Sequence, residues 1–271
     1  MRTRGVGNMD KEWVNSVQEY ILSFGYDGPL RTVCRKSSVL FLFGKNSGRY
    51  WLKIYFSTHE RLAESEARVL SQLHKAGCSV PYPVFGKILK FQEIEGDVLL
   101  MSEVYGVKLT KGLSVSIEVL VAELCRVHEN MNRISSSEVS LLKKAFLPKR
   151  DDKAFLRLEM TEKLRELRKK YKYMPKQLIH GDVYEDNLFF NETEVSIIDF
   201  SDMKMGIIEE DVANVVRLAL RYDICSIEHA LNSVKHYYKN IDTKIVLVIA
   251  AYNEVIYGNE SRARKIAVEI L

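Results

Sequence analysis

The sequence predicts an α+β chain with two lobes, an antiparallel β-sheet lobe followed by a mostly helical lobe. Strand-type alternation dominates between Leu30 and Glu103, and helical periodicity dominates after Ser116. The 271 residues are enough for a hydrophobic core in each lobe. We therefore expect an N-terminal lobe of residues 1–103 and a C-terminal lobe of residues 104–271.

The N-terminal lobe is expected to begin with a helix over residues 10–23, which ends before Gly25. A turn at Lys45–Gly48 and a chain break at Val80–Pro83 interrupt the pattern that follows, and Ser57 with Glu60 forms a capping box for a helix running to Gly77. A second turn is expected at Glu95–Gly96. The strand-type segments are residues 31–35, 39–43, 50–56, 87–93 and 97–103.

The C-terminal lobe is expected to be helical, with a serine-rich linker at residues 134–140. Its helices are predicted at residues 116–133, 151–173, 211–221, 225–238, 243–257 and 261–271. Three short strands interrupt them, at residues 177–179, 188–190 and 195–198.

Composition excludes several classes of protein. A net charge of +4 is too small to indicate nucleic-acid binding, and the longest apolar stretch, Ile245–Tyr252, is too short to span a membrane. No apolar run follows Arg2 and Arg4, so a signal peptide is not expected. The four cysteines show no metal-binding spacing and are typical of reduced thiols in a cytoplasmic protein. The oligomeric state is left open.

Two linked motifs are the most informative feature. The chain reads H-G-D-x-x-x-x-N over residues 180–187 and I-D-F over residues 198–200, set between the three short strands. Phosphoryl transfer needs a carboxylate at the acceptor hydroxyl and oxygen ligands for Mg²⁺, which Asp182, Asn187 and Asp199 can supply. A β-hairpin with polar tips is the structural alternative, but order, spacing and strand context together favour a catalytic loop.

This spacing is similar to that of the protein-kinase catalytic loop, with Gly181 where protein kinases place Arg. The chain thereby resembles the aminoglycoside phosphotransferase and choline kinase family of small-molecule kinases, over roughly residues 30–221. The resemblance implies a protein-kinase-like fold, ATP (GTP in some members), Mg²⁺ and a small-molecule hydroxyl acceptor. It assigns catalysis to Asp182 and metal binding to Asn187 and Asp199, with His180 as a scaffold residue.

Lys53 is the expected phosphate-binding lysine, oriented by a carboxylate from the following helix. Glu66 matches the pattern of the family in that helix, with Glu64 as its competitor. An ordinary surface salt bridge is the alternative for this pair.

The phosphate-covering loop and the hinge are the looser matches. Residues 34–38 contain no glycine, so Ser37 and Ser38 are candidates for phosphate contacts, or for a polar hairpin turn. Ser102 and Val104 lie where the hinge backbone would bind adenine. His128 and Asp211 are expected to be structural, and the basic run Lys169–Lys172 to be a solvated face.

The implied function is transfer of the γ-phosphate of a Mg-nucleotide to a hydroxyl of a small molecule, with a protein Ser/Thr kinase or a non-catalytic nucleotide-binding module as alternatives. Asp211 follows Asp199 too closely for an activation loop, and the other histidines form no metal set. The small positive charge favours an amino alcohol or sugar-like acceptor over a polycationic antibiotic. The acidic candidates for a cationic acceptor are Glu209, Glu210, Asp223, Glu254 and Glu260.

Overall fold

The structure, a computed structural model, describes residues 11–23, 25–27, 29–34, 38–55, 62–91, 94–135, 137, 139 and 160–270. The described chain separates into two compact units. The first contains the described residues up to Val104 and those of segment 135–139; the second contains Tyr105–Ile134 and the described residues from Met160 onward. None of the described helices has the length and apolar character needed to cross a bilayer.

One antiparallel sheet of five strands organises the first unit. Its strands are β1 (Pro29–Cys34), β2 (Ser38–Lys45), β3 (Gly48–Tyr55), β4 (Pro83–Phe91) and β5 (Ile94–Ser102), in the order β1-β2-β3-β5-β4. A tight turn joins β2 to β3, where Lys45 pairs with Gly48. Both residues between them have positive φ, 48° at Asn46 and 63° at Ser47. This is the left-handed geometry that matches the twist of a hairpin.

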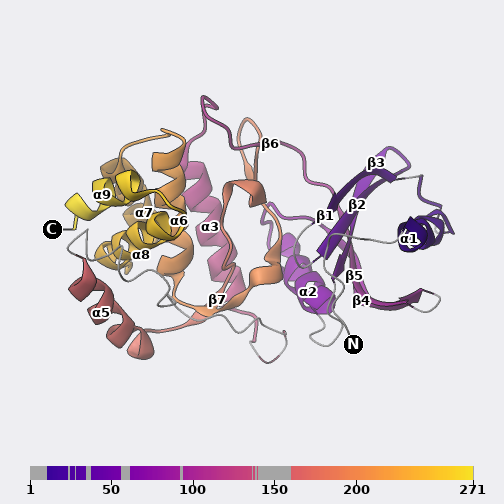
Figure 1. Ribbon diagram of the computed structural model, residues 1–271, viewed down its shortest axis with the longest axis horizontal. Helices are drawn as coiled ribbons and strands as arrows, with labels where there is room; N and C mark the ends of the chain where they lie inside the picture. The colour runs from indigo at the N-terminus through magenta and orange to yellow at the C-terminus, as the bar shows by residue number, and fades with distance from the viewer. Residues whose placement is uncertain are drawn as a thin grey trace. The chain divides into compact units, whose positions relative to one another are not determined.

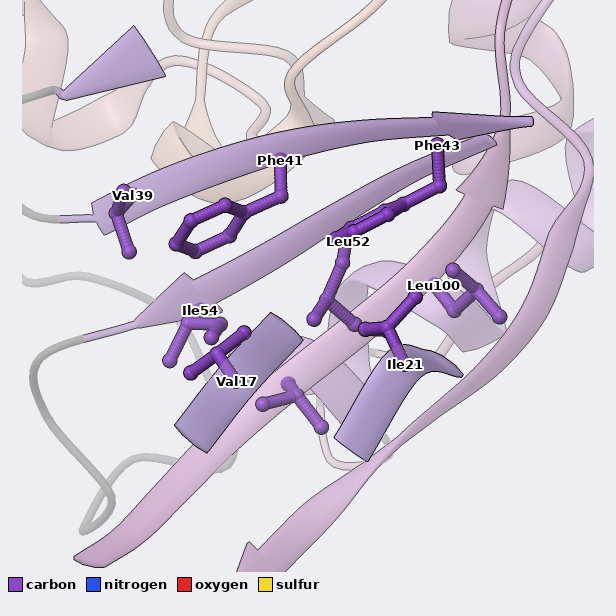
Figure 2. Close-up of a cluster of buried hydrophobic side chains, with 9 residues drawn as sticks. Val17, Ile21, Val39, Phe41, Phe43, Leu52, Ile54 and Leu100 are labelled. Carbon is purple, nitrogen blue, oxygen red and sulfur yellow. The ribbon is translucent and has the colours of Figure 1, made fainter. Parts of the chain in front are cut away.

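Two helices, α1 (Lys11–Ser23) and α2 (Leu62–Lys75), cover opposite faces of this sheet (Figure 1). Alternation along β3 produces the two faces, because successive side chains of a strand point in opposite directions. Leu52 and Ile54 join the buried cluster in which Val17 and Ile21 of α1 lie against β2, β3 and β5, as Figure 2 shows. The intervening Lys53 points the other way, toward α2.

Three expectations for this unit need correction or lie outside the described residues. The turn expected at Glu95–Gly96 is wrong, because these residues belong to β5 and pair with Lys90 and Leu89. β4 begins at Pro83 rather than at residue 87, which the sheet tolerates because β4 is an edge strand. The capping box of Ser57 and Glu60 lies outside the described residues.

The second unit is mostly helical. Its helices are α3 (Ile117–Met131), α5 (Thr161–Lys170), α6 (Ile208–Arg221), α7 (Ile227–Tyr237), α8 (Thr243–Ile256) and α9 (Glu260–Val268). α6 packs against α3, α7 and α8, and α9 packs against α8 (Figure 1). The apolar run of α8 is buried from Val246 to Tyr252, because helices contact it on more than one side.

Short strands and single helical turns bring the motif residues together in this unit. β7 (Gln177–Ile179) pairs with β10 (Lys204–Gly206), and β8 (Leu188–Phe190) pairs with β9 (Val195–Ile197) and with β6 (Val107–Lys108). The 3₁₀ turns are η3 (Tyr171–Tyr173), η4 (Glu185–Asn187) and η5 (Phe200–Asp202). The predicted α+β fold, with an antiparallel sheet lobe and a helical lobe, is confirmed.

Candidate active site

The loop between β7 and β8 fixes Asp182 beside Asn187. The Asn187 side-chain Nδ2 donates to the Asp182 backbone oxygen and to Asp182 Oδ2, each at 2.9 Å. Asn187 ends the short η4 turn, so the five-residue spacing of the motif closes this loop on itself. The carboxylate of Asp182 is thereby held in one orientation while the residue stays partly exposed.

Asp199 lies at the same end of the β8–β9 hairpin as Asn187. The backbone N–H of Ile198 donates to Asn187 O at 3.0 Å, which extends the antiparallel pairing by one step. Asp199 then adopts a left-handed conformation with φ 65° and ψ 69°, uncommon for a residue other than glycine. Ser201 Oγ donates to Asp199 Oδ1 at 2.7 Å and secures this conformation. Such local strain is typical of functional sites.

Asn187 has an oxygen suited to a metal ion. Its side chain is buried, and within the part of the chain that the structure describes, Oδ1 has no hydrogen-bond partner. A buried acceptor without a donor is rare, since the great majority of such groups are satisfied. Amide and carboxylate oxygens are the ligands that Mg²⁺ prefers, so Asn187 and Asp199 fit a divalent cation.

His180 is a scaffold for the loop. Its ring is fully buried and lies edge-on to Phe200, with 4.5 Å between the ring centroids. Nδ1 accepts the backbone N–H of Asp182 at 3.2 Å, and Nε2 donates to Ile198 O at 3.0 Å. Both ring nitrogens are therefore used within the scaffold, and the bonds connect the loop to the end of β9.

Gly181 is required by geometry. Its φ is +80°, and a Cβ placed there would lie 2.4 Å from the backbone oxygen of Asp202. Any side chain would collide with the segment between β9 and β10, so the loop accepts only glycine at this position.

Asp211, in the first turn of α6, accepts hydrogen bonds from the backbone of the catalytic loop. Oδ2 accepts the backbone N–H of His180 at 2.8 Å and Oδ1 accepts that of Gly181 at 2.9 Å. Its carboxylate is completely buried, which by itself would raise its pKa. The hydrogen bond and electrostatic attraction of the His128 ring, the attraction of the His180 ring and the N–H of Gly181 outweigh burial and hold the pKa of Asp211 below its ordinary value.

A buried chain of hydrogen bonds extends from Asp211 to the end of α7. His128 Nε2 lies 2.9 Å from Asp211 Oδ2, and His128 Nδ1 lies 2.9 Å from the Tyr238 hydroxyl. Burial raises the pKa of Tyr238 far above its ordinary value, so its hydroxyl stays protonated and donates to His128. This chain connects α3, α6 and α7 to the catalytic loop. Sequence reasoning placed His128 and Asp211 as structural residues and missed Tyr238.

In the first unit, Lys53 and Glu66 form a buried pair. Lys53 Nζ lies 3.0 Å from Glu66 Oε2, and the two side chains are 1% and 0% exposed. Tyr55, also on β3, donates its hydroxyl to the same carboxylate oxygen. The competitor Glu64 is on the exposed side of α2, so the carboxylate facing Lys53 is that of Glu66.

The other candidates for nucleotide binding lie in different parts of the first unit or outside the described residues. Ser37 lies outside the described residues, and Ser38 is the first residue of β2, buried and paired with Tyr55. Ser102 ends β5, where its backbone N–H donates to Tyr82 O at 2.8 Å. This N–H is therefore already engaged within the unit. Val104 is the last residue of this unit before the chain enters the second unit at Tyr105.

An aromatic pair beside Asp182 was not predicted. Tyr184 is two residues after Asp182, and its hydroxyl donates to that of Tyr257 at 2.6 Å. Burial raises the pKa of Tyr184, and the charge of Asp182 adds to the increase. The Arg217 guanidinium lies over both rings, with its central carbon 5.3 Å from the Tyr184 ring centroid and 4.7 Å from the Tyr257 ring centroid. No sequence spacing connects residues so far apart in the chain, so only the fold could bring them together.

Glu254 holds this arginine in place. It is fully buried, with Oε1 at 2.9 Å from Arg217 Nε and Oε2 at 2.7 Å from Arg262 Nε. One carboxylate therefore balances two guanidinium groups. Glu254, a sequence candidate for contact with a cationic acceptor, is engaged in the interior instead.

The chain matches a known family of enzymes. The phosphotransferase enzyme family matches residues 36–231, which is most of the chain. No curated protein sequence matches it. An amicoumacin kinase has a similar fold at 15% identity, with a TM-score of 0.69 and 96% of each chain covered. So has the aminoglycoside phosphotransferase APH(4)-Ia at 14% identity, with a TM-score of 0.62 and coverage of 94% of this chain and 97% of that one.

A third structure of similar fold is the spectinomycin phosphotransferase APH(9)-Ia, at 16% identity and a TM-score of 0.58. The match covers 94% of this chain and 86% of that one. At identities this low, the structural similarity establishes the shared kinase-like fold alone. The family match adds the activity class, phosphotransferase. The chain belongs to the phosphotransferase enzyme family.

Proposed function

We propose that this enzyme transfers the γ-phosphate of ATP, with GTP as the other candidate donor, to a hydroxyl group of a small molecule in the presence of Mg²⁺. The observation that carries this proposal is the contact between Asn187 and Asp182. It holds a carboxylate beside an amide oxygen that lacks a donor among the described residues. Phosphoryl transfer in kinases depends on this combination of a positioned carboxylate and metal-binding oxygens.

Asp182 would act on the acceptor. The Asp182 carboxylate, hydrogen-bonded to Asn187, can accept a hydrogen bond from the acceptor hydroxyl, orient it for in-line attack and take its proton. Asn187 donates to Asp182 Oδ2, and the loop backbone around Asp182 is held by His180. The rigidity of this loop supports a positioning role, since little rearrangement is needed on binding.

Asn187 and Asp199 would hold the metal ion. When bound, Mg²⁺ would neutralise charge on the phosphates. The buried Oδ1 of Asn187 and the strained backbone of Asp199 support this assignment, because each then has a functional reason.

The first unit would bind the nucleotide. Lys53, oriented by Glu66, would contact the α- and β-phosphates, as in the resemblance that predicted it. Ser37 and Ser38 remain candidates for phosphate contacts. At the hinge, the N–H of Ser102 is engaged with Tyr82, so its carbonyl and the backbone of Val104 are the candidates for contact with the adenine edge.

Structures of similar fold support a nucleotide, a divalent cation and a small-molecule acceptor. The amicoumacin kinase was solved with AMP-PNP, Ca²⁺ and amicoumacin, and APH(4)-Ia with ADP and hygromycin B. Spectinomycin phosphotransferase was solved with ADP and spectinomycin. These compounds differ widely, so the acceptor of this chain follows from its own residues rather than from theirs.

The residues around the loop favour an acceptor that is not polycationic. Tyr184 and Tyr257 offer two hydroxyls and two rings near Asp182, which suits a sugar-like or aromatic compound. The positive guanidinium of Arg217 already lies over the Tyr257 ring, which disfavours a cationic group of an acceptor on the opposite face of that ring. Among the described residues, the nearby carboxylates of Glu254 and Glu185 are paired with arginines.

A protein kinase receives less support. The chain between Asp199 and α6 consists of η5 and β10, and β10 pairs with β7. This leaves no segment there that could dock a peptide substrate. A metal hydrolase built on His180 and Asp182 would need further ligands, and the part of the chain that the structure describes contains no group of three His, Cys, Asp or Glu side chains that could hold a metal ion.

The test is nucleotide turnover with Mg·ATP and Mg·GTP against simple sugars, choline, ethanolamine, homoserine and aminoglycosides. We expect release of ADP or GDP that depends on a non-polycationic acceptor, with the mass of that acceptor increased by one phosphate group. Asp182→Asn is the control and should abolish the transfer. Turnover stimulated by a peptide and by no small molecule would contradict the proposal.

A further inference from the structure

A pocket lies in the helical unit, away from the catalytic loop. Its volume is about 810 Å³, and its walls come from the η3–β7 segment, the start of α6, and the connection between α7 and α8. No residue from His180 to Asp199 lines it. Gln177, at the first position of β7, lines the pocket, whereas the catalytic loop follows the last position of the same strand. The pocket is therefore separate from the site described above.

The pocket combines an apolar interior with a basic rim. Half-buried apolar side chains line it, among them Met174, Ile208 and Ile241. Three exposed lysines also line it: Lys170, Lys176 and Lys239. Among the described residues, none of these ammonium groups forms an ion pair, and Lys176 lies over the Tyr171 ring, 4.6 Å from its centroid. Tyr173, 89% exposed, adds an aromatic ring to the lining.

The two carboxylates in the lining are engaged with backbone groups. Glu209 is buried and accepts the backbone N–H of Asp242, and its burial raises its pKa. Asp242 caps α8 by accepting the N–H groups of Lys244 and Ile245, at 3.0 and 3.3 Å. Three lysines line the pocket against these two carboxylates, so the charge offered to a ligand is positive. An apolar cavity with unpaired lysines at its edge matches an organic anion with an apolar or aromatic body.

Tyr238 connects this pocket to the catalytic loop. It lines the pocket, and its hydroxyl is the outer end of the buried chain through His128 to Asp211. Gln177, also in the lining, donates Nε2 to the backbone oxygen of His128 at 3.3 Å. Two lining residues therefore contact the histidine that supports Asp211, which in turn holds the N–H groups of His180 and Gly181.

We propose that this pocket is a second binding site, for a small organic anion with an apolar or aromatic body, and that its occupancy is transmitted to the catalytic loop through Tyr238 and His128. The proposal does not depend on the identity of the phosphate acceptor. It gives a function to part of the basic run at residues 169–172, because Lys170 belongs to the pocket while Lys169 and Lys172 do not.

Binding can be measured with 8-anilinonaphthalene-1-sulfonate and its uncharged analogue N-phenyl-1-naphthylamine, by fluorescence and calorimetry on the full chain. We expect one sulfonate per chain. The triple variant K170Q/K176Q/K239Q should bind it about tenfold more weakly, since each exposed charge contributes modestly. The matched control K163Q/K169Q/K172Q removes the same charge from exposed lysines of α5 and η3 outside the pocket, and should change the affinity less than about twofold. Equal affinities of the two triple variants, or equal binding of the uncharged analogue by the wild type, would overturn the site.

Transmission to the loop can be measured by hydrogen exchange, which needs no acceptor. Saturating sulfonate should slow exchange of the His180 and Gly181 amides, because these N–H groups donate to Asp211. Tyr238→Phe removes only the hydroxyl that contacts His128, and should retain sulfonate binding while losing the effect on the two amides. Unchanged exchange in the wild type, or an undiminished effect in Tyr238→Phe, would overturn the coupling.

Discussion

Glu66 shows how strongly single residues are constrained in this chain. Its carboxylate is fully buried and faces Lys53 and Tyr55. Glu66→Gln keeps the size of the side chain but leaves the Lys53 charge in the interior without its partner charge. We expect the free energy of unfolding to fall by about 3 kcal/mol, because a buried charge that loses its partner is costly. Urea denaturation measures it.

Glu64→Gln, two residues before Glu66 and on the exposed side of α2, is the matched control for that change. An exposed position should alter the free energy of unfolding by less than about 0.5 kcal/mol. Equal losses in the two variants would mean that the Lys53–Glu66 pair has no special role in stability.

Asp211 gives a pH-dependent prediction. The pKa of the Asp211 carboxyl is lower in the folded chain than in the unfolded chain, so the carboxyl stabilises the folded chain at pH values above its unfolded pKa. This contribution is lost as the pH falls through the folded pKa. Asp211→Asn should therefore be less stable than the wild type at neutral pH and lose less stability below about pH 4. Urea denaturation between pH 3 and 7 tests this; parallel curves for the two proteins would contradict the assignment.

The residues of the candidate site divide into those with a sequence signal and those without one. Asp182, Asn187 and Asp199 were predictable because a catalytic loop and the following hairpin fix their spacing in the chain. Tyr238 and Tyr257 were not, because their partners are distant in the sequence. Tyr238 contacts His128, 110 residues away, and Tyr257 contacts Tyr184, 73 residues away. Such contacts are decided by helix packing, which leaves no local pattern.

At the scale of elements, the turn between β2 and β3 is a sensitive position. Ser47 has φ 63°, a conformation that glycine adopts without cost, and Asn-Gly is the preferred pair for such a hairpin. Ser47→Gly should therefore raise the free energy of unfolding by up to about 1 kcal/mol. Thermal or urea denaturation measures the change. A loss of stability would mean that the hydroxyl of Ser47 matters more than its backbone conformation.

Long periodic elements were predictable, and very short ones were not. The helix expected at residues 116–133 is α3, capped by Ser116. β6 and β10 have only two and three residues, too few for an alternating pattern, and depend on partners elsewhere in the chain. α6 begins at Ile208 rather than at Asp211, because Glu210 accepts the backbone N–H of Ile207 at 3.2 Å and replaces a polar N-cap.

For the whole molecule, we expect stabilisation that depends on both nucleotide and metal. A ligand at a hundredfold excess over its dissociation constant should stabilise the folded chain by about 2.7 kcal/mol. Mg·ATP should therefore raise the melting temperature of the wild type, and chelation of the metal should reverse part of the increase. Differential scanning fluorimetry measures both.

Asp199→Asn should lose the metal-dependent part of this stabilisation, since its carboxylate is a proposed ligand. Asp202→Asn, three residues further on in η5, is the control and should keep it. An equal response to Mg²⁺ in Asp199→Asn and the wild type would remove Asp199 from the metal site.

In the proposed reaction, Asp182 prepares an acceptor hydroxyl for phosphoryl transfer. The most direct measurement compares wild type and Asp182→Asn for acceptor phosphorylation and for nucleotide binding under the same conditions. We expect the transfer rate to fall by ~10²–10⁴-fold, the usual contribution of a general base, with nucleotide affinity nearly unchanged. A variant that still transfers phosphate within about tenfold of the wild-type rate would contradict the claim.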